Sequence, residues 1–391
     1  MAIIVGVPRE TAAGETRVAL VPAVAGKYVA VGAHLVVERG AGDRSHYLDG
    51  QFGTSVEPGD AARALGADVV LKVRPPSPGE VDFMSEGAVL VGLLDPYRAV
   101  ESVTALATRK VTSFALELLP RITRAQAMDA LTSQASVAGY KAVLMAASLS
   151  GRYFPMLTTP AGTIRPAKVL VLGVGVAGLQ AIATARRLGA MVEAYDVRRA
   201  TKEQVHSLGG RFIDTGIDAE AEGGYARELT ADEKAKAAAI VADHVAAADA
   251  VITTAAVPGR PAPRLIDAAT VGRMKPGAVV VDLAAETGGN CEVTRPGEQV
   301  EHGGVIVAGP VNVPAMLPVH ASDQYARNVF NFISPFIKDG DLALDWEDEV
   351  LAGSVLTHDG RIVNDAIRRI VEGDDGAPAV QPSGDASGGA A

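Results

Sequence analysis

The sequence predicts an α/β protein with two Rossmann-like, doubly wound domains, the first of them discontinuous along the chain. Short apolar runs alternate with segments of helical spacing over residues 3–120 and again over residues 167–307. Strands that alternate with helices form parallel sheets. A glycine-rich turn stands near the start of the second region, and a core-like helical segment follows that region at residues 322–337. The 391 residues are enough for two full cores.

The first region predicts strands at residues 3–7, 34–38, 68–73, 87–94 and 111–118, with helices at 22–31, 61–65 and 99–108. A long Ala-, Leu- and Met-rich helix is expected over residues 123–150, with Thr123 as its N-cap. Residues 151–166 contain three prolines and are expected to form a loop that leads into the second region.

The glycine-rich turn has the surroundings that nucleotide binding requires. An apolar run at Val169–Leu172 enters Gly173-Val-Gly175-Val-Ala-Gly178, and a helical pattern, a second apolar run and Asp196 follow. In such a turn the first glycine permits the sharp bend, the second admits a pyrophosphate, and the third lets helix and strand pack closely. The free N–H groups at the helix start then hold the phosphates. This stretch predicts a dinucleotide site.

Asp196 favours NAD(H) as the dinucleotide. It ends the second strand of the motif, 18 residues after Gly178. A carboxylate at this place accepts hydrogen bonds from both ribose hydroxyls and repels a 2′-phosphate. Arg198 and Arg199 follow directly and carry the opposite charge, which weakens the preference.

The second region continues the alternation after Asp196. Helices are expected at residues 202–208, 231–246 and 265–272, and strands at 211–213, 250–253, 278–283 and 305–307. Residues 214–230 are acidic and glycine-containing, as in a mobile surface loop. We therefore predict a first domain from residues 1–130 and 312–371, an NAD(H)-binding domain from 131–311, and a disordered tail or linker at 372–391.

Composition excludes several classes of function. The net charge of −10 disfavours nucleic acid as a partner. The single cysteine, Cys291, rules out an internal disulfide framework, and the seven histidines form no HxH or HxxxH pair, so no metal site is expected. Neither a signal peptide nor a membrane-spanning apolar run is visible, which predicts a cytoplasmic location without a direct membrane span.

Several long motifs together resemble one family over roughly residues 1–370. They are the stretches Pro120–Asp129, Ser133–Tyr140, Gly173–Ala190, Asp196–Gly210, Gly223–Tyr225, Thr253–Pro263, Met274–Gly277 and Val281–Cys291. The chain resembles the soluble NAD(H)-binding domain I, or alpha-1 subunit, of proton-translocating nicotinamide nucleotide transhydrogenase. Alanine dehydrogenase shares that fold. The resemblance implies two α/β domains that flank a cleft, an NAD(H) site in that cleft, and a homodimer.

The resemblance also implies roles for particular residues. Arg121, Gln126 and Asp129 match the segment that positions the nicotinamide ring, and Thr132 stands where the family has a serine. The positions implied near the nicotinamide are Arg121, Ile122, Thr123, Arg124, Gln126, Asp129, Thr132 and Ser133. The pyrophosphate would lie near Val174, Gly175, Val176 and Gly178, and the ribose near Asp196, Val197, Arg198 and Ala256. Gly224 and Tyr225 match a mobile loop that closes over bound nucleotide.

The function implied is Re/Si-specific transhydrogenation, with direct hydride transfer from NADH to NADP⁺ on a partner. The chain has one GxGxxG motif and no membrane span. We therefore expect the NADP(H)-binding and membrane parts on other polypeptides, with this chain peripheral to the inner face of the cell membrane. The polar tail after Glu372 suits either a natural terminus or a tether within a longer chain.

Two alternatives remain at this point. Arg17 and Lys72 resemble the substrate-binding pair of alanine dehydrogenase, but that family's catalytic histidine is absent from Val91–Pro96, and Glu286 stands where it has aspartate. Without an acid/base group the two cations are interpreted as structural remnants. The other alternative is an NAD-binding sensor. Direct hydride transfer between two nicotinamides needs proximity and orientation but no acid/base residue. The lack of such a residue therefore does not distinguish a transhydrogenase subunit from an NAD-binding sensor.

Overall fold

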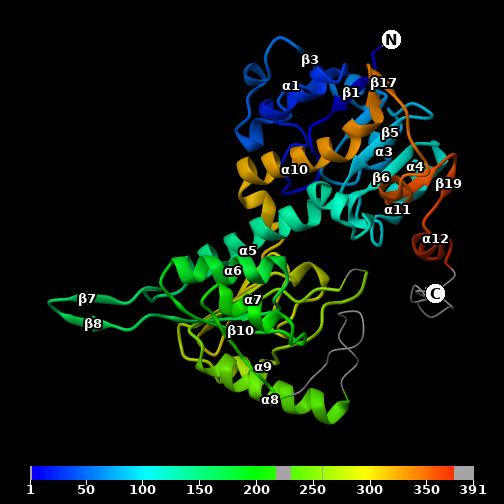
Figure 1. Cartoon of the computed structure of the whole chain (residues 1–391). Helices are drawn as coiled ribbons and strands as arrows, with labels where there is room; N and C mark the ends of the chain where they lie inside the picture. The colour runs from blue at the N-terminus through cyan, green and yellow to red at the C-terminus, as the bar shows by residue number, and fades with distance from the viewer. Residues whose placement is uncertain (1, 217–229, 258, 374–391) are drawn as a thin grey trace, which may run out of the picture.

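Two parallel-stranded sheets organise the protein, as the computed structural model in Figure 1 shows. The structure describes residues 2–216, 230–257 and 259–373. We call the part built on the eight-stranded sheet the first lobe and the part built on the seven-stranded sheet the second lobe. The predicted surface loop and tail, including Gly224 and Tyr225, lie for the most part outside the described residues.

The first lobe has the strand order β3-β2-β1-β4-β5-β6, which is the doubly wound order 3-2-1-4-5-6. Its parallel strands are β1 (Ile4–Val7), β2 (His34–Glu38), β3 (Val56–Gly59), β4 (Val69–Leu71), β5 (Val89–Gly92) and β6 (Thr112–Ala115). Beyond β6, the antiparallel strands β18 (Val355–His358) and β19 (Arg361–Ile362) extend the sheet. Its helices are α1 (Pro22–Ala30), α2 (Ala61–Leu65), α3 (Pro78–Val81), α4 (Val100–Thr108), α10 (Pro318–Ile333), α11 (Glu349–Ser354) and α12 (Asp365–Glu372).

The second lobe repeats this order as β11-β10-β9-β12-β13-β15, with β14 antiparallel at the edge. Its strands are β9 (Lys168–Leu172), β10 (Met191–Tyr195), β11 (Arg211–Phe212), β12 (Ala250–Thr253), β13 (Val279–Asp282), β14 (Gln299–His302) and β15 (Val305–Ala308). The helices are α6 (Val176–Arg187), α7 (Thr201–Ser207), α8 (Ala231–Ala247) and α9 (Ala268–Gly272). The central strands are buried on both faces, which explains why they read as continuous apolar runs.

Two chain segments connect the lobes. Helix α5 (Ala130–Leu149) leads out of the first lobe, lies between the two lobes in Figure 1, and packs against both α6 and α10. The chain returns through the 3₁₀ turn Val313–Met316 into α10. The apolar face of α10 places Tyr325, Val329 and Phe332 fully buried in the core of the first lobe. The last third of the chain therefore contributes to the core that the first third begins.

Some expected elements differ from the structure for local reasons. A 3₁₀ helix covers Thr123–Met128, and α5 begins only at Ala130, because Asp129 leaves the helical conformation and its carboxylate accepts from the Thr132 backbone N–H. Thr123 is therefore not the N-cap that the sequence predicted. Helix α10 begins at Pro318 rather than at residue 322, since proline suits the first helical position.

The expected loop at residues 151–166 contains a two-stranded hairpin instead. Its strands are β7 (Leu157–Thr159) and β8 (Gly162–Ile164), and it projects away from the second lobe. The edge strand β3 was also not predicted, because Pro58 disfavours a strand; an edge position tolerates it.

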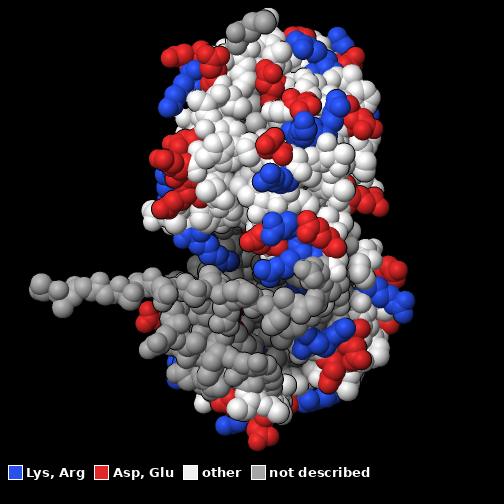
Figure 2. Space-filling view, turned by 90° about the vertical axis from the view of Figure 1, so that its right-hand side faces the viewer, with Lys and Arg blue, Asp and Glu red and all other residues white. Residues whose placement is uncertain are grey.

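On the face drawn in Figure 2, acidic and basic side chains of the described residues are interspersed. Within the described ranges, no helix is long and apolar enough to cross a bilayer, and no group of three or more His, Cys, Asp or Glu side chains is arranged to hold a metal ion.

Candidate nucleotide-binding site

The glycine-rich turn joins β9 to α6 in the geometry that its three glycines require. Gly173 has φ +95°, a left-handed conformation that side chains rarely adopt. A Cβ on Gly178 would lie 1.9 Å from the carbonyl oxygen of Gly173, so the helix can approach the strand only because residue 178 is glycine. A Cβ on Gly175 would meet no atom of the described residues within 4 Å. The two outer glycines are thus needed by the fold, whereas the middle one faces open space.

The space at Gly175 fits a bound pyrophosphate. Gly175 is the N-cap of α6 and makes no side-chain cap, so the first N–H groups of this helix remain available to an anion. Gly175 and Val176 are exposed. Thr254 stabilises the turn, because its hydroxyl donates to the Gly173 carbonyl at 2.9 Å. A close approach of phosphate to backbone therefore meets no steric obstacle at this position.

Asp196 lies beside the turn and is engaged by two partners. One carboxylate oxygen accepts from the Val174 backbone N–H at 2.7 Å. The Arg198 guanidinium donates to both oxygens at 3.0 Å, and this hydrogen bond raises the pKa of Arg198. The Arg198 side chain also reaches the Val174 carbonyl at 3.4 Å. The structure therefore brings Asp196, Arg198 and Val174 together, and the aspartate is already paired with a cation.

The end of β12 is fixed by residues to which the sequence assigned no role. Asn290 holds Ala255 through two hydrogen bonds, from the Ala255 N–H at 3.0 Å and to its carbonyl at 2.8 Å. Asp282 is fully buried and accepts from the Thr253 hydroxyl at 2.8 Å. Ala256, the predicted ribose neighbour, follows this fixed strand end and is exposed. The only sequence signal for Asn290 and Asp282 was their presence inside a family motif.

The predicted nicotinamide segment lies at the N-terminal end of α5. Arg121, Thr123, Arg124, Gln126 and Thr132 are exposed, Ile122 and Ser133 are part-buried, and Asp129 caps α5. Both Asp129 oxygens are used by Thr132, whose N–H and hydroxyl donate at 2.9 and 2.6 Å. Arg124 forms an ion pair with Asp348. Among the described residues no ion pair joins Arg121 to Asp129, and the Asp129 carboxylate instead caps α5.

The structure connects this segment to the glycine-rich turn through helix packing rather than through direct contact. Helix α5 packs along α6, and the α-carbon of Gly139 comes so close that a Cβ there would lie 2.1 Å from the Ala177 carbonyl oxygen. Gly139 and Ala177 thus join α5, which begins at Ala130, to α6, which begins at Val176. The two predicted ends of the nucleotide site are parts of one packed unit.

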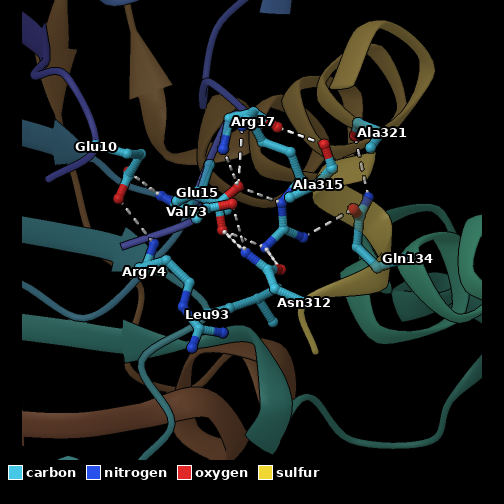
Figure 3. Close-up of polar contacts among 12 residues, drawn as sticks. Glu10, Glu15, Arg17, Val73, Arg74, Leu93, Gln134, Asn312, Ala315 and Ala321 are labelled. Carbon is cyan, nitrogen blue, oxygen red and sulfur yellow. Dashed lines mark hydrogen bonds and ion pairs between the residues drawn. The ribbon is translucent and has the colours of Figure 1, made fainter. Parts of the chain in front are cut away.

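A buried ionic cluster lies in the first lobe, near the two chain segments that connect the lobes (Figure 3). The Arg17 guanidinium binds both carboxylate oxygens of Glu15, at 2.8 and 2.7 Å, and also donates to Gln134 at 2.9 Å and Asn312 at 3.1 Å. Burial alone would raise the pKa of Glu15, but the hydrogen bonds and charge of Arg17 outweigh it and lower that pKa. Arg17 thereby contacts both segments that connect the lobes.

Lys72 is neutralised in a similar way. Its ammonium lies 2.8 Å from Glu80 and 3.5 Å from Glu10, and only 1% of its side chain is exposed. Burial opposes the charge of Lys72, yet the two carboxylates outweigh burial and raise its pKa. The Glu10 carboxylate also accepts from the Val73 and Arg74 backbone N–H groups. Both cations that resemble a substrate-binding pair are therefore held by carboxylates of this chain.

Comparisons with known sequences place the chain. Residues 6–138 match the alanine dehydrogenase/PNT N-terminal domain, and residues 142–365 match the corresponding C-terminal domain. The chain belongs to the alanine dehydrogenase/PNT family. It is 47% identical over 378 residues to the first part of the NAD(P) transhydrogenase alpha subunit of Rhodospirillum rubrum, covering 93% of this chain and 98% of that protein. Alanine dehydrogenase of Mycolicibacterium smegmatis is 29% identical, with 94% and 96% covered.

Solved structures agree with this assignment. Transhydrogenase from Sinorhizobium meliloti is similar with a TM-score of 0.82 at 45% identity, covering 93% of this chain and 99% of that one. An L-alanine dehydrogenase follows with a TM-score of 0.76 at 26% identity, covering 95% and 99%. The α/β fold with two parallel sheets and the family resemblance are thus confirmed. Membership of this family also confirms NAD(H) as the cofactor, which the open space at Gly175 fits.

Proposed function

We propose that this chain is the NAD(H)-binding subunit of a proton-translocating, Re/Si-specific NAD(P)⁺ transhydrogenase. It would give hydride directly from NADH to NADP⁺ on a partner subunit, while other subunits couple the transfer to proton movement across a membrane. The observation that carries this proposal is the state of Arg17 and Lys72. Both are buried and bound by carboxylates, so neither presents a free charge to a substrate carboxylate, as an amino-acid dehydrogenase needs.

The residues of the second lobe would bind one end of the nucleotide. The N–H groups at the start of α6 hold the pyrophosphate, and Asp196 with Arg198 stands at the adenosine ribose. In the nicotinamide segment, Gln126 and Thr132 would bond the carboxamide and so fix which ring face is presented. The bound nucleotide supplies the hydride. The protein then contributes orientation, which is where most of the rate gain of such a step arises.

The decisive experiment mixes this chain with an NADP(H)-binding partner domain and measures hydride exchange between NADH and an NADP analogue. Exchange is expected only when both proteins are present. No exchange with a partner known to be competent would favour the sensor. Reduction of NAD⁺ with L-alanine by this chain alone would instead establish an alanine dehydrogenase.

Two substitutions test the roles within the segment. Gln126→Ala and Asp129→Asn should slow hydride transfer far more than they weaken NADH binding, because the ring is misplaced while the rest of the nucleotide remains held. Asparagine retains the ability to cap α5. Equal losses in transfer rate and in affinity would contradict the positional role. Asp196→Ala is expected to reduce discrimination against NADPH, and an unchanged preference would assign selection to another group.

We further propose a homodimer in which the hairpin β7–β8 contacts a second copy of the chain. A two-stranded hairpin has little stability of its own, and the surface near its base exposes Tyr153, Met156, Ile164 and Met191. Met156→Lys with Ile164→Lys should convert the dimer to a monomer in light scattering. Leu48→Lys, an exposed residue of the first lobe, is the matched control. An unchanged mass for the double variant would contradict this interface.

The location and the domain boundaries remain proposals. Association with the inner face of the cell membrane would occur through partner subunits and should appear as co-purification with a membrane complex. Domain limits at residues 130/131 and 311/312 would be supported if residues 131–311 folded alone and bound NADH.

A further inference from the structure

The nicotinamide segment is held in place by an ion pair that connects distant parts of the chain. Arg124, within the 3₁₀ helix Thr123–Met128, donates to the carboxylate of Asp348, 224 positions later. The Arg124 hydrogen bond holds the pKa of Asp348 below its usual range, so the pair is charged at neutral pH. Charge-assisted hydrogen bonds of this kind are the stronger ones in proteins.

Asp348 is the fixed partner of this pair. Its side chain is only 11% exposed, compared with 52% for Arg124. It also caps α11, accepting from the Val350 backbone N–H at 2.8 Å. Val350 and Leu351 behind it are fully buried in the first-lobe core. Because the carboxylate is anchored in this way, the contact restrains the exposed arginine and the segment that carries it.

A second anchor holds the segment on the other side of Gln126. The carbonyl of Ala127 accepts from the side chains of Asn328 and Asn331 on α10, at 2.9 and 3.0 Å. The backbone is thus tied at residues 124 and 127. The Gln126 side chain between them is exposed and makes no hydrogen bond within the described part of the chain. A side chain left free on a fixed backbone is the arrangement that ligand positioning needs.

We propose that Asp348 is a positioning residue for hydride transfer, which it promotes by holding Arg124 and thereby the backbone of Gln126. The inference rests on the function proposed above. It changes the role of Arg124 from a nucleotide ligand to the link between the segment and α11. Loss of the link would let the segment move, and a displacement of about 1 Å at a reacting group can cost roughly 100-fold in rate.

The test uses Asp348→Asn in the full chain. Asparagine caps helices as well as aspartate does, so α11 keeps its N-cap while Arg124 loses its anionic partner. With a competent NADP(H) partner, kcat for hydride transfer should fall about 10-fold or more. The Kd for NADH should change much less. Arg124→Gln should have the same effect, and the double variant should be no worse than either single variant.

The control is Glu86→Gln, which breaks the exposed Lys110–Glu86 pair of the same lobe. The only tryptophan, Trp346, lies two residues before Asp348 and near Phe114 and His358, so its emission reports whether this region remains folded. Equal rates for Asp348→Asn and Glu86→Gln would overturn the inference. Additive losses in the double variant would also overturn it, because Asp348 would then act independently of Arg124.

Amide hydrogen exchange separates this inference from the proposed function. Without any partner or nucleotide, Asp348→Asn should accelerate exchange in residues 121–129 about 10-fold or more and leave α1 unchanged. Unchanged exchange would overturn the positioning role whatever the transfer assay gives. Failure of the unmodified chain to transfer hydride to a competent partner, with the expected change in exchange, would remove the proposed function and leave the anchoring role of Asp348 intact.

Discussion

The two lobes share a strand order but differ at the place where doubly wound sheets bind ligands. In each sheet the strand order reverses between two neighbouring parallel strands, which are β1 and β4 in the first lobe and β9 and β12 in the second. The carboxyl ends of these two strands lie side by side. In the first lobe this place holds Lys72, directly after β4, together with Glu10 and Glu80. In the second lobe it holds Gly173, directly after β9, and Thr254 after β12. One crevice is filled by the chain's own charges, and the other is left open.

This difference teaches that topology supplies a location and side chains decide its use. A buried cation with two carboxylates leaves no free charge for a ligand, and the ions stabilise the fold only as a complete set. Small residues at the same location leave backbone N–H groups accessible. Residues of the first crevice should therefore affect stability alone, whereas the second crevice should separate into residues that affect stability and residues that affect binding.

The largest effect is expected for Lys72→Met in the first crevice. The substitution leaves the buried Glu10 and the part-buried Glu80 without their cation, which should lower the free energy of unfolding by about 3–5 kcal/mol. Urea denaturation measures it. Lys110→Met, which removes an exposed ion pair of the same lobe, should change stability little. NADH affinity of the folded Lys72→Met protein should be unaltered, and a large loss of affinity would break the distinction between the crevices.

Gly178→Ala should reduce stability through the second crevice. Its Cβ would lie 1.9 Å from the Gly173 carbonyl oxygen, so β9 and α6 must separate. We expect a loss of about 2–3 kcal/mol, visible as a lower thermal midpoint, together with weaker NADH binding. A variant as stable as the original protein would show that the helix does not depend on this close approach.

The pH dependence of stability tests whether a buried carboxyl group of the first lobe, that of Glu117, affects folding. Burial raises the pKa of Glu117 to about 7, and its carboxylate accepts from the Leu94 and Asp95 N–H groups. Between the ordinary pKa of 4.5 and pH 7, the folded state binds the proton and the unfolded state does not. Stability should therefore fall as pH rises through this window, by about 3 kcal/mol.

Glu117→Gln should remove this pH dependence, because the amide does not titrate. Chemical denaturation of both proteins at pH 5, 6, 7 and 8 gives the comparison. Parallel stability curves for the two proteins would contradict the assignment to Glu117.

The smallest effect on stability is expected for Gly175→Ala. This substitution most clearly separates an effect on nucleotide binding from an effect on the fold. Within the described part of the chain no atom lies within 4 Å of the added Cβ, so the thermal midpoint should hardly change. NADH affinity should fall about 10-fold, or about 1.4 kcal/mol, because the methyl group occupies space next to the pyrophosphate. Unchanged affinity would mean that the phosphates bind elsewhere.

The sequence predicted the parts of this molecule that depend on local pattern. The alternation of strands and helices and the turn Gly173–Gly178 were confirmed, because parallel strands and a left-handed turn each impose a short-range requirement on residue type. The α5 start was wrong by seven residues, since Asp129 competes for the cap that Thr123 was expected to form. The Arg124–Asp348 pair could not be predicted, because nothing local relates residues 224 positions apart.

The contact between Gly139 and Ala177 has a consequence for how a dinucleotide is accommodated. Helix α5 (Ala130–Leu149) is about 30 Å long, and the contact joins it to the first turn of α6, beside the proposed pyrophosphate position. The distance between the proposed phosphate site and the segment at Gln126 is therefore set by the packing of the two helices. A dinucleotide would be selected by its length as well as by its charge, and a mononucleotide could reach only one end.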